Sequence, residues 1–117
     1  MEFPALIICP SVYFIMVDKI SFSLIFIFIW ITHYFNRTII YPIRIKTKGK
    51  KIPIVIVASA FFFNLVNGVL NGYFITLIRF ESISFIYLIS GLFVFIIGFY
   101  INISSDNTLI KLRTNQK

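Results

Sequence analysis

The residues most able to do chemistry lie in three polar clusters set within or beside strongly apolar stretches. Polar groups at membrane depth are costly, so such clusters commonly face a bundle interior and carry function. The first occupies residues 33–42, and four of its side chains recur at i, i+3, i+4 and i+7 on one predicted helical face: Tyr34, Arg37, Thr38 and Tyr41. Two phenols, a guanidinium and a hydroxyl would therefore point the same way. The alternative is an interfacial aromatic belt with a snorkelling arginine.

The second cluster lies near the end of the chain. Asn102, Asp106 and Arg113 are spaced i, i+4 and i+11, which places them on one face of a continuing helix. An amide, a carboxylate and a guanidinium at a membrane boundary could bind the ribose and phosphates of a nucleotide. A solvated helix end explains the same residues.

The third cluster combines amides with small residues. Asn64, Asn67 and Asn71 share a helical face with Gly68 and Gly72, which form a GxxxG motif. Glycines at this spacing let a neighbouring helix approach closely, while the amides form hydrogen bonds across the contact. Helix packing is the simplest interpretation of this cluster.

Other chemistries are excluded by what the sequence lacks. His33 is the single histidine and Cys9 the single cysteine, so neither a zinc site nor a Cys–His nucleophile is expected. Cys9 lies in an apolar segment and is expected to be a small buried hydrophobe. There is no GxGxxG motif and no P-loop, so any nucleotide would be bound without a Rossmann fold.

The elements that must position these clusters are membrane helices. Hydrophobic residues make up 59% of the chain and charged residues 13%, against roughly 45–50% and about 25% in soluble domains. The prediction is an all-α polytopic transmembrane bundle of about four helices in a single domain. Its apolar runs are about 3–17, 20–35, 52–78 and 83–103, the first of which is short for a span.

Basic residues predict the orientation of the bundle. Six of the eleven Lys and Arg residues lie between positions 37 and 51, which we expect to form a basic cytoplasmic loop. Pro42 marks the expected helix end. A cytoplasmic N-terminus would place nine basic residues inside and two, Lys19 and Arg79, outside. This pattern accounts for the net charge of +7 without nucleic-acid binding.

Four stretches, in this order, resemble motifs of the steroid 5α-reductases, the 3-oxo-5α-steroid 4-dehydrogenase family. Residues 1–5 (MEFPA) are similar to an M/QE-x-P motif, and residues 33–54 (HYFNRTIIYPIRIKTKGKKIPI) to HYxxRTxIYP…GKxxP. Residues 65–74 (LVNGVLNGYF) resemble NGxLQGxY, with Asn71 where the family usually has Gln. Residues 98–113 (GFYINISSDNTLIKLR) resemble GxxINxxSDxxLxxLR.

The resemblance implies an oxidoreductase that reduces the 4,5 double bond of 3-oxo-Δ4 steroids with NADPH, in a multi-pass protein of the endoplasmic reticulum membrane. Glu2 and Tyr34 match the pair that holds the 3-keto oxygen, where a tyrosine bonded to a buried, neutral Glu2 would stabilise developing negative charge. The implied cofactor-binding positions are Arg37, Tyr41, Asn102, Asp106 and Arg113.

Members of that family are about twice as long, so we expect this chain to lack their first helix and their C-terminal helices. The alternatives are an enoyl-CoA reductase of very-long-chain fatty acid elongation and a small non-catalytic membrane protein.

Overall fold

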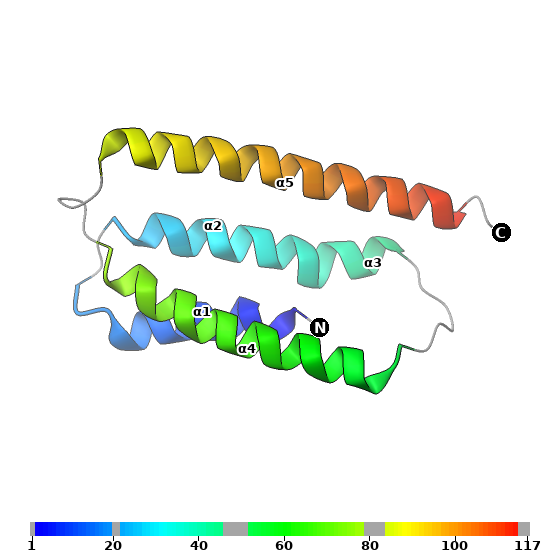
Figure 1. Cartoon of the computed structure of the whole chain (residues 1–117), viewed down its shortest axis with the longest axis horizontal. Coiled ribbons are helices and arrows are strands. Elements are labelled where there is room, and N and C mark those ends of the chain that lie inside the picture. The colour runs from blue at the N-terminus through cyan, green and yellow to red at the C-terminus, as the bar shows by residue number, and fades with distance from the viewer. Residues whose placement is uncertain (1, 20–21, 46–51, 79–83, 115–117) are drawn as a thin grey trace.

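The computed structural model describes residues 2–19, 22–45, 52–78 and 84–114. Throughout these ranges the secondary structure is helical and contains no strand, which confirms the predicted all-α class. The helices lie side by side along the longest axis of a molecule measuring 55 × 29 × 18 Å (Figure 1). In chain order they are α1 (Phe3–Met16), α2 (Leu24–Phe35), η1 (Asn36–Ile40), α3 (Tyr41–Ile45), α4 (Ile54–Thr76) and α5 (Phe85–Thr114).

Three helical segments of the described chain are long and apolar enough to cross a membrane: Leu24–Ile45, Ile54–Thr76 and Phe85–Arg113. At 1.5 Å per residue, their 22, 23 and 29 residues exceed the roughly 20 needed to cross a bilayer. Helix α1 is apolar but has only 14 residues, as the short first run predicts. The bundle therefore has three full-length candidate spans and one shorter helix.

The predicted helix end at Pro42 is wrong. Helices α2, η1 and α3 follow one another without interruption to Ile45, so Arg37 and Arg44 lie on a helix and not in a loop. η1 is one turn of π-helix, in which the Tyr41 N–H bonds to the carbonyl oxygen of Asn36, five residues earlier. A proline ring crowds the carbonyl four residues before it, and the wider turn here accommodates Pro42. The lysines predicted beyond it, at 46–51, lie outside the described residues.

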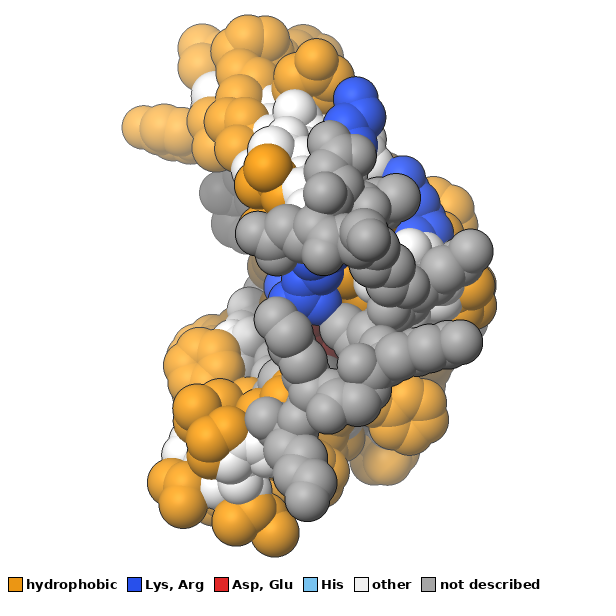
Figure 2. Space-filling view, turned by 90° about the vertical axis from the view of Figure 1, so that its right-hand side faces the viewer, with side chains coloured by type: hydrophobic (Ala, Val, Ile, Leu, Met, Phe, Trp, Pro, Cys, Tyr) orange, Lys and Arg blue, Asp and Glu red, His pale blue; other side chains and the backbone are white. Residues whose placement is uncertain are grey.

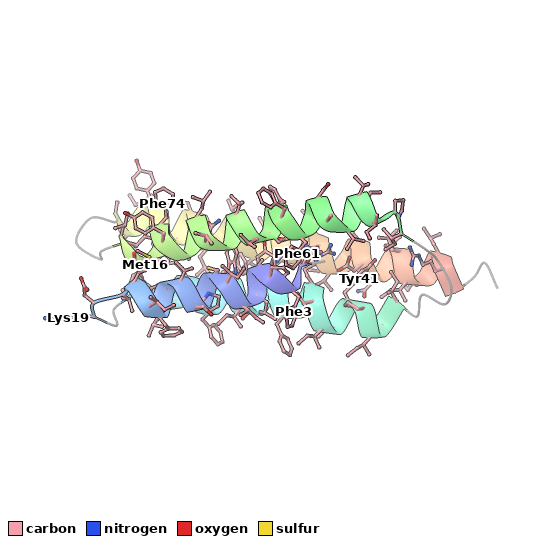
Figure 3. All side chains as sticks on the ribbon, turned by 90° about the horizontal axis from the view of Figure 1, so that it is seen from below. Phe3, Met16, Lys19, Tyr41, Phe61 and Phe74 are labelled. Carbon is pink, nitrogen blue, oxygen red and sulfur yellow. The ribbon has the colours of Figure 1, made fainter. Side chains whose placement is uncertain are left out.

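Helices α1 and α4 form the tightest contact in the bundle, and their ribbons lie against each other in Figure 3. A Cβ added to Gly72 would come within 2.6 Å of the Cys9 carbonyl oxygen, and one added to Gly68 within 3.2 Å of Ile8 Cβ. The GxxxG motif therefore permits close helix approach, as predicted. The small core beside this contact contains Cys9, Tyr13, Ile27 and Ile75.

Hydrogen bonds attach α2, and Ser23 just before it, to α1. The Trp30 indole donates to the Ala5 carbonyl oxygen at 2.8 Å, and the hydroxyls of Tyr13 and Ser23 bond at 2.7 Å in a buried position. Buried polar groups that are paired in this way define the relative position of two helices. Together α1, α2 and α4 form a packed unit.

Helix α5 lies on the far side of α2 from α1 and α4 (Figure 1). Its apolar side chains are largely exposed, including Phe85, Ile86, Phe93 and Val94. The view along the bundle in Figure 2 shows hydrophobic side chains around most of the visible rim, with an indentation between its upper and lower parts. Such surfaces are stable against acyl chains rather than water.

Candidate functional site

Arg37 connects three separate elements. On one side its Nε and Nη2 donate to the Glu2 carboxylate at 3.1 and 2.9 Å, and on the other its Nη1 donates to Asp106 at 3.1 Å and contacts Asn102 Oδ1 at 3.5 Å. Glu2 immediately precedes α1, whereas Asn102 and Asp106 lie one turn apart on α5. The two-atom contact with Glu2 is the strong, oriented form of an arginine–carboxylate pair. This guanidinium therefore ties α5 to the start of α1.

The side chains that form these ion pairs are partly to largely buried. The Asp106 side chain is 6% exposed, while those of Glu2 and Arg37 are 29% and 27% exposed. The Tyr41 ring lies beside the same cation, with its centroid 5.2 Å from Arg37 Cζ, within the range of a cation–π contact. One guanidinium thus pairs with two carboxylates, so Arg37, Glu2 and Asp106 together carry an excess of negative charge.

A polar cavity of about 700 Å³ opens beside these ion pairs. Its walls come from the start of α1 and from α2, η1, α4 and α5. Five of the polar residues that line it are Glu2, Tyr34, Arg37, Asn102 and Asp106, which the sequence singled out.

A second, largely apolar cavity of about 840 Å³ adjoins the first. Three residues, His33, Tyr34 and Gly98, line both cavities. The remaining lining is mostly aromatic and aliphatic side chains of α2, α4 and α5, among them Phe26, Trp30, Phe74, Phe95 and Phe99. Binding sites for small apolar molecules commonly combine such walls with a few polar groups.

Tyr34 stands at the junction of the two cavities. Its ring packs against Trp30 with centroids 4.6 Å apart, and against His33 edge-to-face at 5.2 Å. The phenol oxygen accepts a hydrogen bond from Asn67 Nδ2 at 3.1 Å. The expected bond from Glu2 to Tyr34 is absent from the described structure, because Glu2 is paired with Arg37 instead. Both residues nevertheless line the polar cavity.

Two of the predicted positions lie away from the cavities. Arg113 is exposed and lines neither, since it follows Asp106 by seven residues, about 10 Å along the helix. Tyr41 contacts Arg37 from outside the cavity lining. The structure therefore brings Asn102 and Asp106 together with Arg37 and separates Arg113 from them.

Sequence reasoning missed several residues of this site. His33 was considered only as a metal ligand or base, yet it lines both cavities and also contacts the Phe99 ring, with centroids 6.2 Å apart. Gly98 has open space where its Cβ would lie, and a larger residue there would extend into the cavities. Asn67 was assigned to packing, although its spacing from Asn71 is compatible with a polar chain leading to Tyr34.

The residues that line the polar cavity offer hydrogen-bond donors and acceptors. The described residues contain no group of three potential ligands among His, Cys, Asp and Glu. Asn102 and Asp106 could bond to hydroxyl or amide groups of a ligand in the polar cavity, and Tyr34 could donate to an oxygen atom at the junction. A polar molecule and an apolar one could therefore meet beside Tyr34.

Comparison with known proteins gives relatives of one kind. Residues 50–117 match the family described as 3-oxo-5-alpha-steroid 4-dehydrogenase. A steroid 5-alpha-reductase of Arabidopsis thaliana is 39% identical across 75% of this chain, and one of Gossypium hirsutum is 33% identical across 80%. The 3-oxo-5-alpha-steroid 4-dehydrogenase 2 of Sus scrofa is 37% identical across 69%.

The chain spans 37%, 38% and 32% of the length of these three relatives. No solved structure matches it.

Proposed function

This chain belongs to the 3-oxo-5-alpha-steroid 4-dehydrogenase family, and on that premise we propose that it takes part in NADPH-dependent reduction of the 4,5 double bond of 3-oxo-Δ4 steroids. One observation carries the proposal: a polar and an apolar cavity meet at a tyrosine. The apolar cavity suits a flat lipid such as a steroid, and the polar cavity suits the hydrogen-bonding end of a nucleotide.

Tyr34 is the proposed hydrogen-bond donor to the 3-oxygen of the steroid. Hydride from NADPH adds at carbon 5 of the enone, and negative charge develops on the 3-oxygen of the resulting enolate. A proton from water then adds at carbon 4 and gives the saturated ketone. A donor already directed at the 3-oxygen, in surroundings that exclude water, stabilises this charge without reorganisation. Tyr34 lines both cavities and has Trp30 packed on its ring, which restricts where its hydroxyl can point.

The residues of the polar cavity are compatible with the uncharged part of the cofactor. Asn102 and Asp106 could bond to its ribose hydroxyls or carboxamide, and NADPH supplies the hydride when bound. A phosphate at Arg37 would have to displace Glu2 or Asp106 from the guanidinium and would lie beside two carboxylates. We therefore propose that the described residues hold the nicotinamide end and not the phosphates.

Arg37 and Glu2 then have a supporting role in this proposal. Their ion pair, with Asp106 as the third member, holds α5 against η1 and so defines one wall of the polar cavity. Removing one member of a partly buried ion pair leaves the opposite charge unpaired, so the pairing favours this arrangement of the elements.

We propose the endoplasmic reticulum membrane as the location, on the basis of family membership alone. Three apolar helices of the described chain fit a multi-pass protein. A steroid dissolved in the bilayer would approach the apolar cavity from the lipid side, since the lining helices α2, α4 and α5 are the candidate spans.

The test is reduction of a 3-oxo-Δ4 steroid by membranes that contain this chain, with NADPH and mass-spectrometric detection of the saturated ketone. Tyr34→Phe should lower the rate by about 10²–10³, the usual loss for one oxyanion donor. Tyr100→Phe, on an exposed tyrosine of α5, is the matched control and should keep the rate.

Absence of product at saturating NADPH would contradict catalysis by this chain alone and would favour a non-catalytic role. An enoyl thioester offered in place of the steroid separates the two reductase chemistries. Turnover of the thioester in preference to the steroid would contradict the proposed substrate class.

A further inference from the structure

A chain of side-chain amides leads along α4 to Tyr34, and its direction is determined by a backbone carbonyl. Asn71 Nδ2 lies 2.9 Å from the Asn67 carbonyl oxygen and 2.9 Å from Asn67 Oδ1. A backbone carbonyl can only accept a hydrogen bond, so the Asn71 group facing it must be the NH₂. The second hydrogen of that NH₂ is then donated to Oδ1, which fixes which end of the Asn67 amide is oxygen.

The orientation of Asn67 determines what Tyr34 can do. With its oxygen toward Asn71, Asn67 presents its NH₂ to the phenol oxygen at 3.1 Å. A phenol has one hydrogen to donate. Because this bond uses a lone pair of the oxygen, the phenol hydrogen is left over, and within the described residues it has no acceptor.

We propose that Asn67, oriented by Asn71, is a positioning residue that directs the Tyr34 proton toward the 3-oxygen of the steroid. The inference rests on the proposed function and deepens it. If both amides were flipped, Tyr34 would donate its hydrogen to Asn67 Oδ1. The steroid oxygen would then face a phenol whose hydrogen is already used.

The position of the two amides beside the apolar cavity strengthens the Tyr34 hydroxyl as a hydrogen-bond donor. Asn71 lines the apolar cavity and Tyr34 lines both cavities. The hydrogen-bonded amides therefore run along the wall against which the steroid would lie. Hydrogen bonds strengthen one another in a low-dielectric site, and donation from Asn67 to the phenol oxygen makes the phenol hydrogen a better donor. Glu2, which the resemblance pairs with Tyr34 at the 3-keto oxygen, is held by Arg37 instead.

A purely structural role for the amides is the competing explanation, in which they only hold α4 against α2. The two explanations differ in what they predict for the atoms of the bond. Carbon-13 NMR of the chain in nanodiscs, with tyrosine labelled at Cζ, gives one signal for each of the six tyrosines. Loss of one signal in Tyr34→Phe identifies Tyr34.

Asn67→Leu, which keeps the shape and removes the amide, should move the Tyr34 signal and leave the other five in place. The second label is carbon 3 of a 3-oxo-Δ4 steroid, whose signal moves when its oxygen accepts a hydrogen bond. Binding to the wild-type chain should move it, and Asn67→Leu and Tyr34→Phe should each lose most of that shift. Thr76→Val, an exposed hydroxyl of the same helix bonded to its own backbone, should change neither signal.

Each result decides the matter. A Tyr34 signal unchanged in Asn67→Leu overturns the inference whatever the steroid does, and leaves the proposed function standing if the steroid signal still shifts. A Tyr34 signal that moves while the steroid shift stays at its wild-type value also overturns it. A steroid signal identical in wild-type and Tyr34→Phe chains overturns the proposed function and the inference together.

Asn71→Leu keeps the test decisive if Asn67→Leu does not fold. It leaves Asn67 in place and removes only the group that orients it. The same movement of the Tyr34 signal, to a smaller extent, is the supporting result, and an unchanged signal is the contradicting one.

Discussion

Two regions of the bundle are packed differently: α1 and α4 are in close contact, whereas open space separates α5 from α2 and α4. In the first, glycines bring two backbones so close that a Cβ on Gly72 would fall 2.6 Å from a carbonyl oxygen. In the second, two cavities of about 700 and 840 Å³ separate the elements. Ion pairs at Arg37 and a hydrogen bond from Arg44 to Asn107 join them.

The difference indicates where stability and function lie. Without a hydrophobic driving force between helices in lipid, close backbone packing is what holds a helix pair together. Incomplete packing leaves room for ligands, but polar contacts at defined points are then needed to maintain the distance between the helices. We infer that α1, α2 and α4 form the frame and that α5 is the wall placed against it. Substitutions in the frame should therefore change the free energy of unfolding most, and substitutions in the cavities least.

The largest effect is expected at the packed contact. Gly72→Val would place side-chain atoms against the Cys9 carbonyl and against Val12, whose Cβ lies 2.9 Å from the built Cβ. Overpacking of this kind should lower the free energy of unfolding by about 3 kcal/mol. Gly91→Val is the control, because a Cβ added there would meet no atom of another helix within 4 Å. Unfolding in mixed micelles, followed by circular dichroism, measures both, and equal stability of the two variants would contradict the packed frame.

A smaller loss is expected at the polar connection. Arg37→Gln leaves two carboxylates without their cation, and it should cost about 2 kcal/mol, less than a fully buried pair because Arg37 and Glu2 remain partly exposed. Arg44→Gln, which affects one exposed hydrogen bond, should cost well under about 1 kcal/mol.

Spin-label distances between α2 and α5 give the second measurement of the same variants. They should become longer and broader in Arg37→Gln and stay as in the wild type in Arg44→Gln. An unchanged distance distribution in Arg37→Gln would mean that α5 is held by something other than these ion pairs.

The hydrogen bond between α1 and the segment before α2 should contribute less again. Tyr13→Phe removes a buried 2.7 Å bond to Ser23 and should cost about 1 kcal/mol. Tyr100→Phe removes the hydroxyl of a tyrosine that is 73% exposed and should leave stability unchanged. A larger loss in Tyr100→Phe than in Tyr13→Phe would reverse the assignment of frame and wall.

The smallest effect on stability is expected inside the cavities. A Cβ added to Gly98 would meet no atom within 4 Å, so Gly98→Leu should leave stability unchanged or slightly raised, since leucine favours helix over glycine. Its side chain would occupy the junction of the two cavities and should abolish steroid binding, measured with a radiolabelled 3-oxo-Δ4 steroid. Gly91→Leu should bind normally, so equal binding by the two variants would place the steroid elsewhere.

The sequence predicted the frame better than the site because local patterns determine the frame. The apolar runs gave the helices, and the spacing of Gly68 and Gly72 indicated close packing. The prediction that the helix ends at Pro42 was wrong because a π-turn accommodates the proline ring. No local rule for proline anticipates such a turn.

Contacts of the site depend on pairings that sequence periodicity does not contain. The spacing of Asn102 and Asp106 predicted a shared face but also included Arg113, because periodicity carries no limit on how far along α5 the cavity extends. The pairing of Glu2 with Arg37 joins residues 35 positions apart, and a tertiary contact of this kind determines which partner Glu2 takes. The direction of the amide chain required the positions of individual atoms.

The most direct test of the role proposed for Tyr34 compares equilibrium binding of two steroids to the chain in nanodiscs: a 3-oxo-Δ4 steroid and the same steroid without its 3-oxygen. We expect the ketone to bind about tenfold more tightly, the value of one good hydrogen bond, and we expect Tyr34→Phe to abolish this preference. Equal binding of the two steroids to the wild-type chain, or a preference that survives in Tyr34→Phe, would contradict the assignment of Tyr34 as the group that receives the 3-oxygen.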